Sequence, residues 1–323
     1  MNDNKTSKNS IVAKFAVPIS FLILFFLAAN FTDCDLVTFW KRRSHLTDLV
    51  VDMIPPDFSY IQKILLPLFY TIQMSVTGTV LGIFFALVLS PFGAANLGFP
   101  AVIRRILRIV IQILRSFPAL ILALTATFLF GLGTFAGTFA ITLYTFAIMT
   151  KLTYEDASAA DVKAYQALRA MGVSKYVAYI HGILPEIIPG FLTNALYLLE
   201  TNVRHSSILG YVGAGGIGLL LNEKISWLEY DKVGTILLML FLTVCVIEYF
   251  SRYLAALIRK ERTIKKEQAR LLLLFLAALF LICTFTLSLP DFSRTSPQTL
   301  RNMFAGFLQP DWSFFFSAEK DGL

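Results

Sequence analysis

The stretch that decides the fold is DVKAYQALRAMGVSKYVAYIHGILP, residues 161–185. Its first half predicts a short helix that ends near Gly172, because glycine suits a C-terminal cap. Ser174 is a preferred N-cap residue and predicts a second helix over 175–181. Residues 182–185, Gly-Ile-Leu-Pro, are predicted to end this helix. Three apolar side chains share one face of the first helix: Val162, Tyr165 and Leu168. The stretch therefore predicts a compact helix pair that suits a groove on another protein.

Long apolar stretches flank this helix pair on both sides. The 323-residue chain is 56% hydrophobic and 15% charged, with a mean hydropathy of +0.68, whereas soluble domains carry about 25% charged residues. Residues 64–103, 116–150 and 271–290 contain no Lys, Arg, Asp or Glu. A bilayer core needs about 20 helical residues per crossing, and each stretch supplies them. The chain is therefore predicted to be an all-α, multi-pass protein of the cell membrane.

Seven hydrophobic segments are predicted to be membrane helices: 11–30, 62–90, 103–131, 134–151, 187–204, 232–256 and 270–289. Gly131 and Gly133 mark a turn between the third and fourth. Six segments form a core within residues 1–260, and the seventh lies beyond it. The run 206–222 is uncharged, but its glycines argue against a spanning helix.

Basic residues predict the orientation. Of the 28 Lys and Arg residues, 17 fall in the cytoplasm and nine outside if the N-terminus is cytoplasmic, while Arg115 and Arg204 lie at membrane depth. Residues 27–29 imitate a signal-peptidase site, but the later spans already require membrane insertion. We therefore expect a cytoplasmic N-terminus and an uncleaved first helix.

Other classes of protein lack support in the sequence. The net charge of +7 is explained by cytoplasmic Lys and Arg, so no nucleic-acid partner is expected. The three cysteines and three histidines show no metal-ligand spacing, and no cofactor is expected in this chain. A G-x-x-x-x-G-K-[ST] phosphate loop is absent, so the chain is not itself an ATPase. A membrane enzyme would need His, Asp or Ser clustered at one membrane face, and no such cluster is found.

A weak repeat links the two ends of the chain. Residues 46–60 match residues 300–314, 254 positions later, in Leu, Pro, Asp and Ser, and the same offset places the first apolar segment on the seventh. Either two amphipathic loops are similar by chance, or a gene duplication is present. In the second case residues 1–260 are one unit, and 261–323 hold a charged linker, an extra helix and the truncated start of a second unit.

The helix pair resembles the corresponding loop in permease subunits of ABC importers, whose motif is E-A-A-x3-G-x9-I-x-L-P. The chain departs from it at Gln166, Leu168 and Gly182. This resemblance implies a type I ABC importer permease fold, in which loop 151–186 docks on a separate ATPase subunit that holds ATP and Mg. The implied coupling surface is Ala164, Gln166, Ala167, Leu168, Ala170, Gly172, Ser174, Leu184 and Pro185.

Residues 199–218, LETNVRHSSILGYVGAGGIG, resemble the segment E-x-N-V-R-S-A-T-V-L-G-x-V-G-A-G-G-I-G of phosphonate-transport permeases. Residues 115–118 and 131–133 also match, and the similarity covers roughly residues 60–260. It implies a non-catalytic importer subunit for phosphonate- or phosphite-type anions, with two ATPase copies, a second permease copy (homodimer or pseudo-dimer), and an extracellular or periplasmic binding protein. A methionine-importer permease, which shares the glycine motif, and a proton-coupled carrier remain alternatives.

Charged residues at membrane depth are the candidates for the translocation pathway. A charge there costs at least about 2.5–3.5 kcal/mol, so Arg115 and Arg204 are expected to face a cavity or a partner. Each either attracts the anion or is structural, as in an Arg204–Glu200 pair at i, i+4; Glu248 and Arg252 have the same spacing. The glycine run suits a gate or re-entrant turn rather than a dinucleotide site. The candidates are Arg115, Glu200, Asn202, Arg204, Gly213, Gly215, Gly216 and Gly218.

Overall fold

A computed structural model describes residues 16, 18–29, 40–259, 266–287, 301 and 305. No strand occurs among these residues, so the predicted all-α class is confirmed. The chain divides into two compact units, residues 1–55 and 56–323. The first unit contains the apolar helix Pro18–Ala29 and α3 (Arg43–Asp52).

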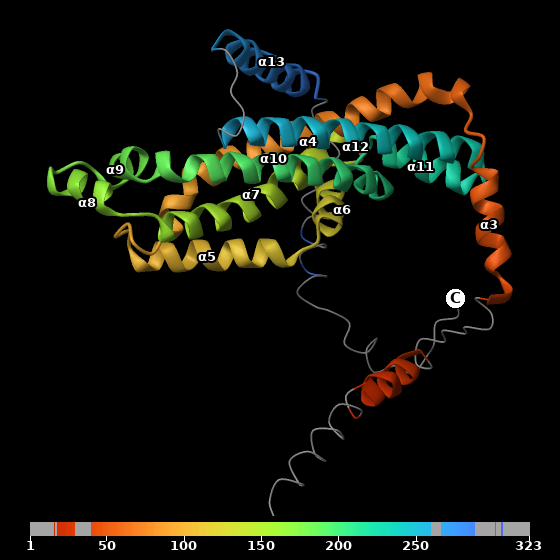
Figure 1. Cartoon of the computed structure of the whole chain (residues 1–323), viewed down its shortest axis with the longest axis horizontal. Coiled ribbons are helices and arrows are strands. Elements are labelled where there is room, and N and C mark those ends of the chain that lie inside the picture. Colours follow the sequence, from red (N-terminus) through yellow and green to blue (C-terminus); the bar gives the residue numbers. More distant parts are fainter. Residues whose placement is uncertain are drawn as a thin grey trace, which may run out of the picture. The chain divides into compact units, whose positions relative to one another are not determined.

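The second unit is a helical bundle (Figure 1). Its long helices run alongside one another, the short pair α8 and α9 lies at one end, and α11 lies at the other end. The elements are η1 (Phe58–Tyr60), α4 (Ile61–Gly93), α5 (Ala101–Ser116), α6 (Ala119–Phe130), α7 (Thr134–Ala159), α8 (Lys163–Ala170), α9 (Lys175–Gly182), α10 (Leu184–Leu209), η2 (Gly210–Val212), α11 (Ile217–Ser226), α12 (Tyr230–Ile258) and α13 (Lys266–Phe285).

The centre of the bundle is the contact between α4 and α7. A Cβ atom at Gly78 would lie 2.8 Å from Ile141 Cβ, and one at Gly82 would lie 2.8 Å from the Thr142 carbonyl oxygen. Small residues allow this close approach of two backbones, as is common between membrane helices. On α7, Thr138 and Thr153 satisfy their hydroxyls on their own helix, by donating to the carbonyls of Thr134 at 2.8 Å and Met149 at 2.6 Å.

The predicted single helix over 103–131 is wrong. The structure has two helices there, α5 and α6, bent by 94°. Pro118 disfavours helical geometry at the preceding residue, and Phe117 is extended, with φ −85° and ψ 126°. The prediction missed this break because it relied on the absence of charged residues. An apolar composition indicates that a segment lies in the membrane, but it does not indicate that the segment is one continuous helix.

Three helices of the described residues are long and apolar enough to cross a membrane: Phe58–Gly93, Thr134–Ala159 and Tyr230–Ile258. The number rises to five if α5 with α6, and α9 with α10, each count as one broken span. Pro18–Ala29 and Leu276–Phe285 are shorter apolar helices. The predicted division at residue 260 stays a prediction.

Candidate functional site

The predicted helix pair is present as α8 and α9. Gly172 follows α8 with φ +85°, a conformation that side-chain-bearing residues rarely adopt. The Ser174 hydroxyl accepts a hydrogen bond from the Val177 amide at 3.4 Å and caps α9. The apolar face of α8 also lies as predicted, with Tyr165 buried and Val162 and Leu168 packed against the same cluster.

The pair is fixed to the bundle by polar contacts to the loop after α4. The Tyr165 hydroxyl donates to the Leu97 carbonyl at 2.6 Å, and Lys175 donates to the Gly98 carbonyl. Burial raises the pKa of Tyr165, which keeps its hydroxyl protonated as a donor. Gly182 lets α9 approach α8: a Cβ there would lie 2.8 Å from the Tyr165 amide nitrogen. The departure from the motif at position 182 therefore coincides with a tight contact.

Most of the predicted coupling residues lie on the surface, and two support it from below. Leu168 and Leu184 are partly buried in the apolar cluster beneath the pair. Sequence analysis missed Met171 and Val177, whose exposed fractions are 70% and 43%. Position 171 could have been found, since the residue before a capping glycine stands at the tip of the turn. The exposed predicted residues are Ala164, Gln166, Ala167, Ala170, Gly172, Ser174 and Pro185.

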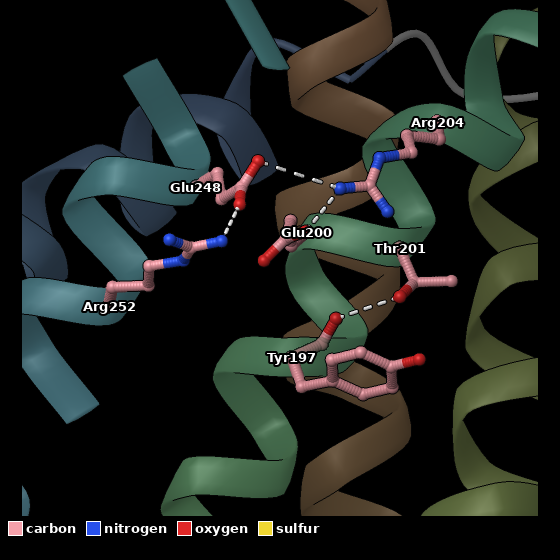
Figure 2. Close-up of polar contacts among 6 residues, drawn as sticks. All are labelled: Tyr197, Glu200, Thr201, Arg204, Glu248 and Arg252. Atoms are coloured by element: carbon pink, nitrogen blue, oxygen red, sulfur yellow. Dashed lines mark hydrogen bonds and ion pairs between the residues drawn. The ribbon is translucent and has the colours of Figure 1, made fainter. Parts of the chain in front are cut away.

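A four-residue charge network joins α10 to α12 (Figure 2). Arg204 pairs with Glu200 one turn earlier on α10, and its Nη2 atom lies 3.9 Å from Glu248 on α12. Glu248 also pairs with Arg252 one turn later. Both predicted i, i+4 pairs are present, whereas the contact between the two helices was not predicted. Two guanidinium groups and two carboxylates make the network electrically neutral.

Asn202, next to this network in the sequence, lies inside the bundle. Its side chain is completely buried, and its amide nitrogen donates to the hydroxyls of Thr79 and Thr145, each at 2.8 Å. Nearby, the hydroxyls of Ser75 and Ser206 are 2.8 Å apart. These bonds tie α10 to both α4 and α7, and they place Asn202 between helices.

Arg115 lies apart from this network, at the C-terminal end of α5. Its side chain is exposed and forms no ion pair with the residues that the structure describes. A cavity of about 330 Å³ lies at the break between α5 and α6, lined by Pro118, Ala119, Leu120, Tyr144, His205, Ile208 and Leu209.

Tyr144 and His205 give this cavity its polar side chains, and sequence analysis missed both. Their rings meet edge to face with centroids 5.1 Å apart. The His205 Nδ1 atom is buried and makes no hydrogen bond with the described residues. The sequence carried a signal, because His205 stands where the resembling segment has serine.

The glycine run forms a tight turn between α10 and α11. Gly213, Gly215 and Gly216 all have positive φ, from +72° to +85°. At Gly218 a Cβ would lie 2.0 Å from the Ser207 carbonyl oxygen, so only glycine fits against the end of α10. The turn borders a cavity of about 400 Å³ lined by Pro67, Tyr70, Gly133, Thr134, Gly215, Gly216, Leu219, Leu220, Glu223 and Thr286.

A second charge cluster lies at the C-terminal end of α11, a helix too short to cross a bilayer. Lys224 is buried, and its Nζ lies 3.0 Å from the carboxylates of both Glu223 and Glu229 and 4.4 Å from the Trp227 ring centroid. The hydrogen bond to Glu229 is the main cause that raises the pKa of Lys224. Hydrogen bonds from Lys232 and Lys224 in turn lower the pKa of Glu229. No motif in the sequence pointed to this cluster.

The broken and continuous spans, the exposed helix pair at one end and the glycine turn at the other define a membrane permease of the type I ABC importer fold. Residues 78–263, more than half of the chain, match the family described as "Binding-protein-dependent transport system inner membrane component". The chain belongs to this family. It is therefore a multi-pass component of a transport system in the membrane.

Curated relatives agree with this family. The phosphite transport system permease protein PtxC of Stutzerimonas stutzeri is 31% identical over 67% of this chain and 79% of its own length. The phosphate-import permease protein PhnE of Mycolicibacterium smegmatis is 32% identical over 62% of this chain, but only 38% of its own length. A solved structure of the MetNI methionine ABC transporter, facing inward, matches 62% of this chain with a TM-score of 0.55. Its 20% identity supports the fold alone.

Proposed function

We propose that this chain is the membrane-spanning subunit of an ATP-driven importer of phosphonate- or phosphite-type anions. The helix pair α8–α9 is the observation that carries this proposal. It presents small, exposed side chains on a short scaffold that buried Tyr165 and Tyr179 fix to the bundle. Such a surface suits a groove on a partner, here the ATP-hydrolysing subunit.

The path from the partner to the transport route follows the chain. α9 ends at Gly182 and α10 begins at Leu184, with a bend of 70° between them. A displacement of the helix pair is therefore passed directly to α10. That helix holds Asn202 against α4 and α7 and ends at the glycine turn. ATP-driven motion at one end of the bundle would thus reach the turn at the other end.

Partners, orientation and chemistry follow from the same assignment. A cytoplasmic N-terminus would place α8–α9 on the side where ATP is available. Two ATPase copies would bind two permease units, and a binding protein would deliver the solute from outside. The chain would supply the route and the coupling surface, while ATP, Mg and hydrolysis belong to the partner.

The anionic substrate class is supported by the names of the relatives and by the charges at membrane depth. Arg204 already has two carboxylate partners, whereas Arg115 has no ion pair among the described residues. Arg115 stands at the end of α5, close in sequence to the cavity that holds Tyr144 and His205. We therefore assign the attraction of the anion to Arg115 and a structural role to Arg204.

Uptake into vesicles tests this function. The vesicles would contain the permease, its ATPase and its binding protein, with labelled methylphosphonate as tracer and phosphite, phosphate and methionine as competitors. ATP-dependent uptake that phosphite blocks and methionine does not would support the proposal. Competition by methionine alone would overturn the substrate class, and uptake without ATP would overturn the importer assignment.

A further inference from the structure

Two backbone amides at the start of α6 have no hydrogen-bond acceptor in the part of the chain that the structure describes. α6 begins directly after Pro118, which offers no capping side chain. The Pro118 carbonyl accepts from the amides of Ile121 at 3.0 Å and Leu122 at 3.2 Å. The amides of Ala119 and Leu120 donate to no described residue. Unpaired amides and the positive end of the helix dipole make such a helix start favourable for an anion.

Two polar rings line the same cavity of about 330 Å³ as the start of α6: Tyr144 of α7 and His205 of α10. Their rings meet edge to face, but neither the Tyr144 hydroxyl nor the His205 imidazole forms a hydrogen bond with the described residues. Polar groups inside a protein normally have a partner, and a missing partner calls for an explanation. Three helices therefore bring unpaired hydrogen-bonding groups to one cavity.

The charges around this cavity favour an anion as the missing partner. No Asp or Glu is among its described lining residues. Arg115, three residues before Pro118, has no ion pair among the described residues, and its charge interacts with Tyr144. Backbone amides and the tyrosine hydroxyl donate hydrogen bonds, and an imidazole donates from at least one ring nitrogen. These groups together can donate to several oxygens of one oxyanion.

The rest of the lining is apolar and consists of Pro118, Ala119, Leu120, Ile208 and Leu209. Inorganic phosphate carries an oxygen in each of its four directions, so one oxygen would lie against carbon atoms at a cost. A phosphonate carries three oxygens and one carbon substituent on its phosphorus. It therefore suits a cavity that combines hydrogen-bond donors with apolar side chains.

From these observations we propose that this cavity is the permease's own binding site for a phosphonate. Tyr144, His205 and the two unpaired amides of α6 hold the oxygens, and the apolar lining holds the carbon substituent. Arg115 attracts the anion to the cavity. The inference rests on the proposed function and adds to it a site of recognition within the permease, which prefers methylphosphonate to phosphate.

Protection of a cysteine from labelling tests whether the site is occupied. The three native cysteines are first replaced by serine. Ile208→Cys then places a thiol in the cavity wall, and Leu132→Cys is the matched control, because this exposed residue does not line the cavity. In the complete transporter, millimolar methylphosphonate should slow maleimide labelling at position 208 and not at position 132. Unchanged labelling at position 208 would overturn the site, and equal protection by phosphate would overturn its preference for a carbon substituent.

Two substitutions test the groups assigned to the site. Tyr144→Phe removes only the hydroxyl, and His205→Leu removes the hydrogen bonds of the imidazole. Each should raise the methylphosphonate concentration for half-maximal protection by about tenfold or more, since hydrogen bonds to charged groups contribute this much to affinity. Tyr249→Phe is the control, because this exposed tyrosine of α12 does not line the cavity. A folded variant with an unchanged half-maximal concentration would overturn the role of the substituted residue.

Uptake by the unchanged chain separates this inference from the proposed function. ATP-dependent uptake of methylphosphonate without protection at position 208 would overturn the binding site and leave the importer assignment in place. Protection at position 208 without ATP-dependent uptake would support the binding site and overturn the importer assignment. The two readouts differ because labelling reports occupancy of the cavity and uptake reports transport.

Discussion

The contact between α8 and α9 predicts a strong effect for the change Gly182→Ala. The new Cβ atom would lie 2.8 Å from the Tyr165 nitrogen and 2.9 Å from its Cα. Both are backbone atoms, so α8 as a whole must move away. Overpacking of this kind costs about 1–3 kcal/mol. Alanine gains at most about 1 kcal/mol over glycine in a helix, and less at the last residue of α9, so the net effect is unfavourable.

The expected result is a loss of coupling. If the net cost falls on the docked geometry of the helix pair, it reduces productive docking by up to about 150-fold, since 1.4 kcal/mol is a factor of ten. ATP hydrolysis and tracer uptake would be measured together in liposomes that contain the complete transporter. We expect Gly182→Ala to lower uptake per ATP hydrolysed while the permease remains inserted in the membrane.

Gly190→Ala is the matched control for this prediction. Gly190 lies in the interior of α10, and a Cβ there would meet no atom within 4 Å. Alanine should therefore stabilise this helix by about 0.5–1 kcal/mol and leave transport unchanged. Equal uptake per ATP for the two variants would refute the argument that the close contact of α8 and α9 sets the coupling surface.

Three further changes test other parts of the structure. Gly172→Pro should abolish ATP-dependent uptake without preventing membrane insertion, because proline fixes φ near −65° and position 172 has +85°; unchanged uptake would contradict the docking role. Asn202→Ala should lower stability in detergent by about 1–3 kcal/mol through two lost buried hydrogen bonds, whereas Thr201→Ala, which loses only a bond within α10, should not. A hydrogen bond from Lys232 lowers the pKa of Glu229. The ionised Glu229 therefore stabilises the folded protein above its ordinary pKa, and this contribution is lost as the pH falls through the lowered pKa. Thermal unfolding of Glu229→Gln should depend less on acid pH than that of the unchanged protein, and an equal dependence would contradict this pairing.

Local signals in the sequence predicted local structure well. The caps at Gly172 and Ser174 fixed the limits of α8 and α9 to within two residues, because capping depends on neighbouring backbone groups. The long apolar runs likewise predicted α4 and α12. The break between α5 and α6 was also local, but Phe117-Pro118 was overlooked inside an uninterrupted apolar run.

Contacts between distant segments could not be predicted in this way. The i, i+4 rule identified Glu200 as a partner of Arg204, but Glu248 lies on another helix 44 residues later. Asn202 was placed in the pathway by its neighbours in a motif. Its actual surroundings, Thr79 and Thr145, come from α4 and α7. The buried face of a membrane helix depends on its partners on other helices. The spacing of residues along one helix does not identify those partners.

The charge network supports the proposed division of roles, in which Arg115 attracts the anion and Arg204 is structural. At 3.9 Å, the attraction between Arg204 and Glu248 is at most about 4 kcal/mol at an effective dielectric of 20, before solvent screening. The closer pair with Glu200 adds to this. An anion that binds Arg204 must therefore displace or approach two carboxylates that repel it. Arg115 imposes no such cost, because no carboxylate of the described residues pairs with it. The neutral network instead suits a clamp that holds α12 against α10 while the helix pair moves.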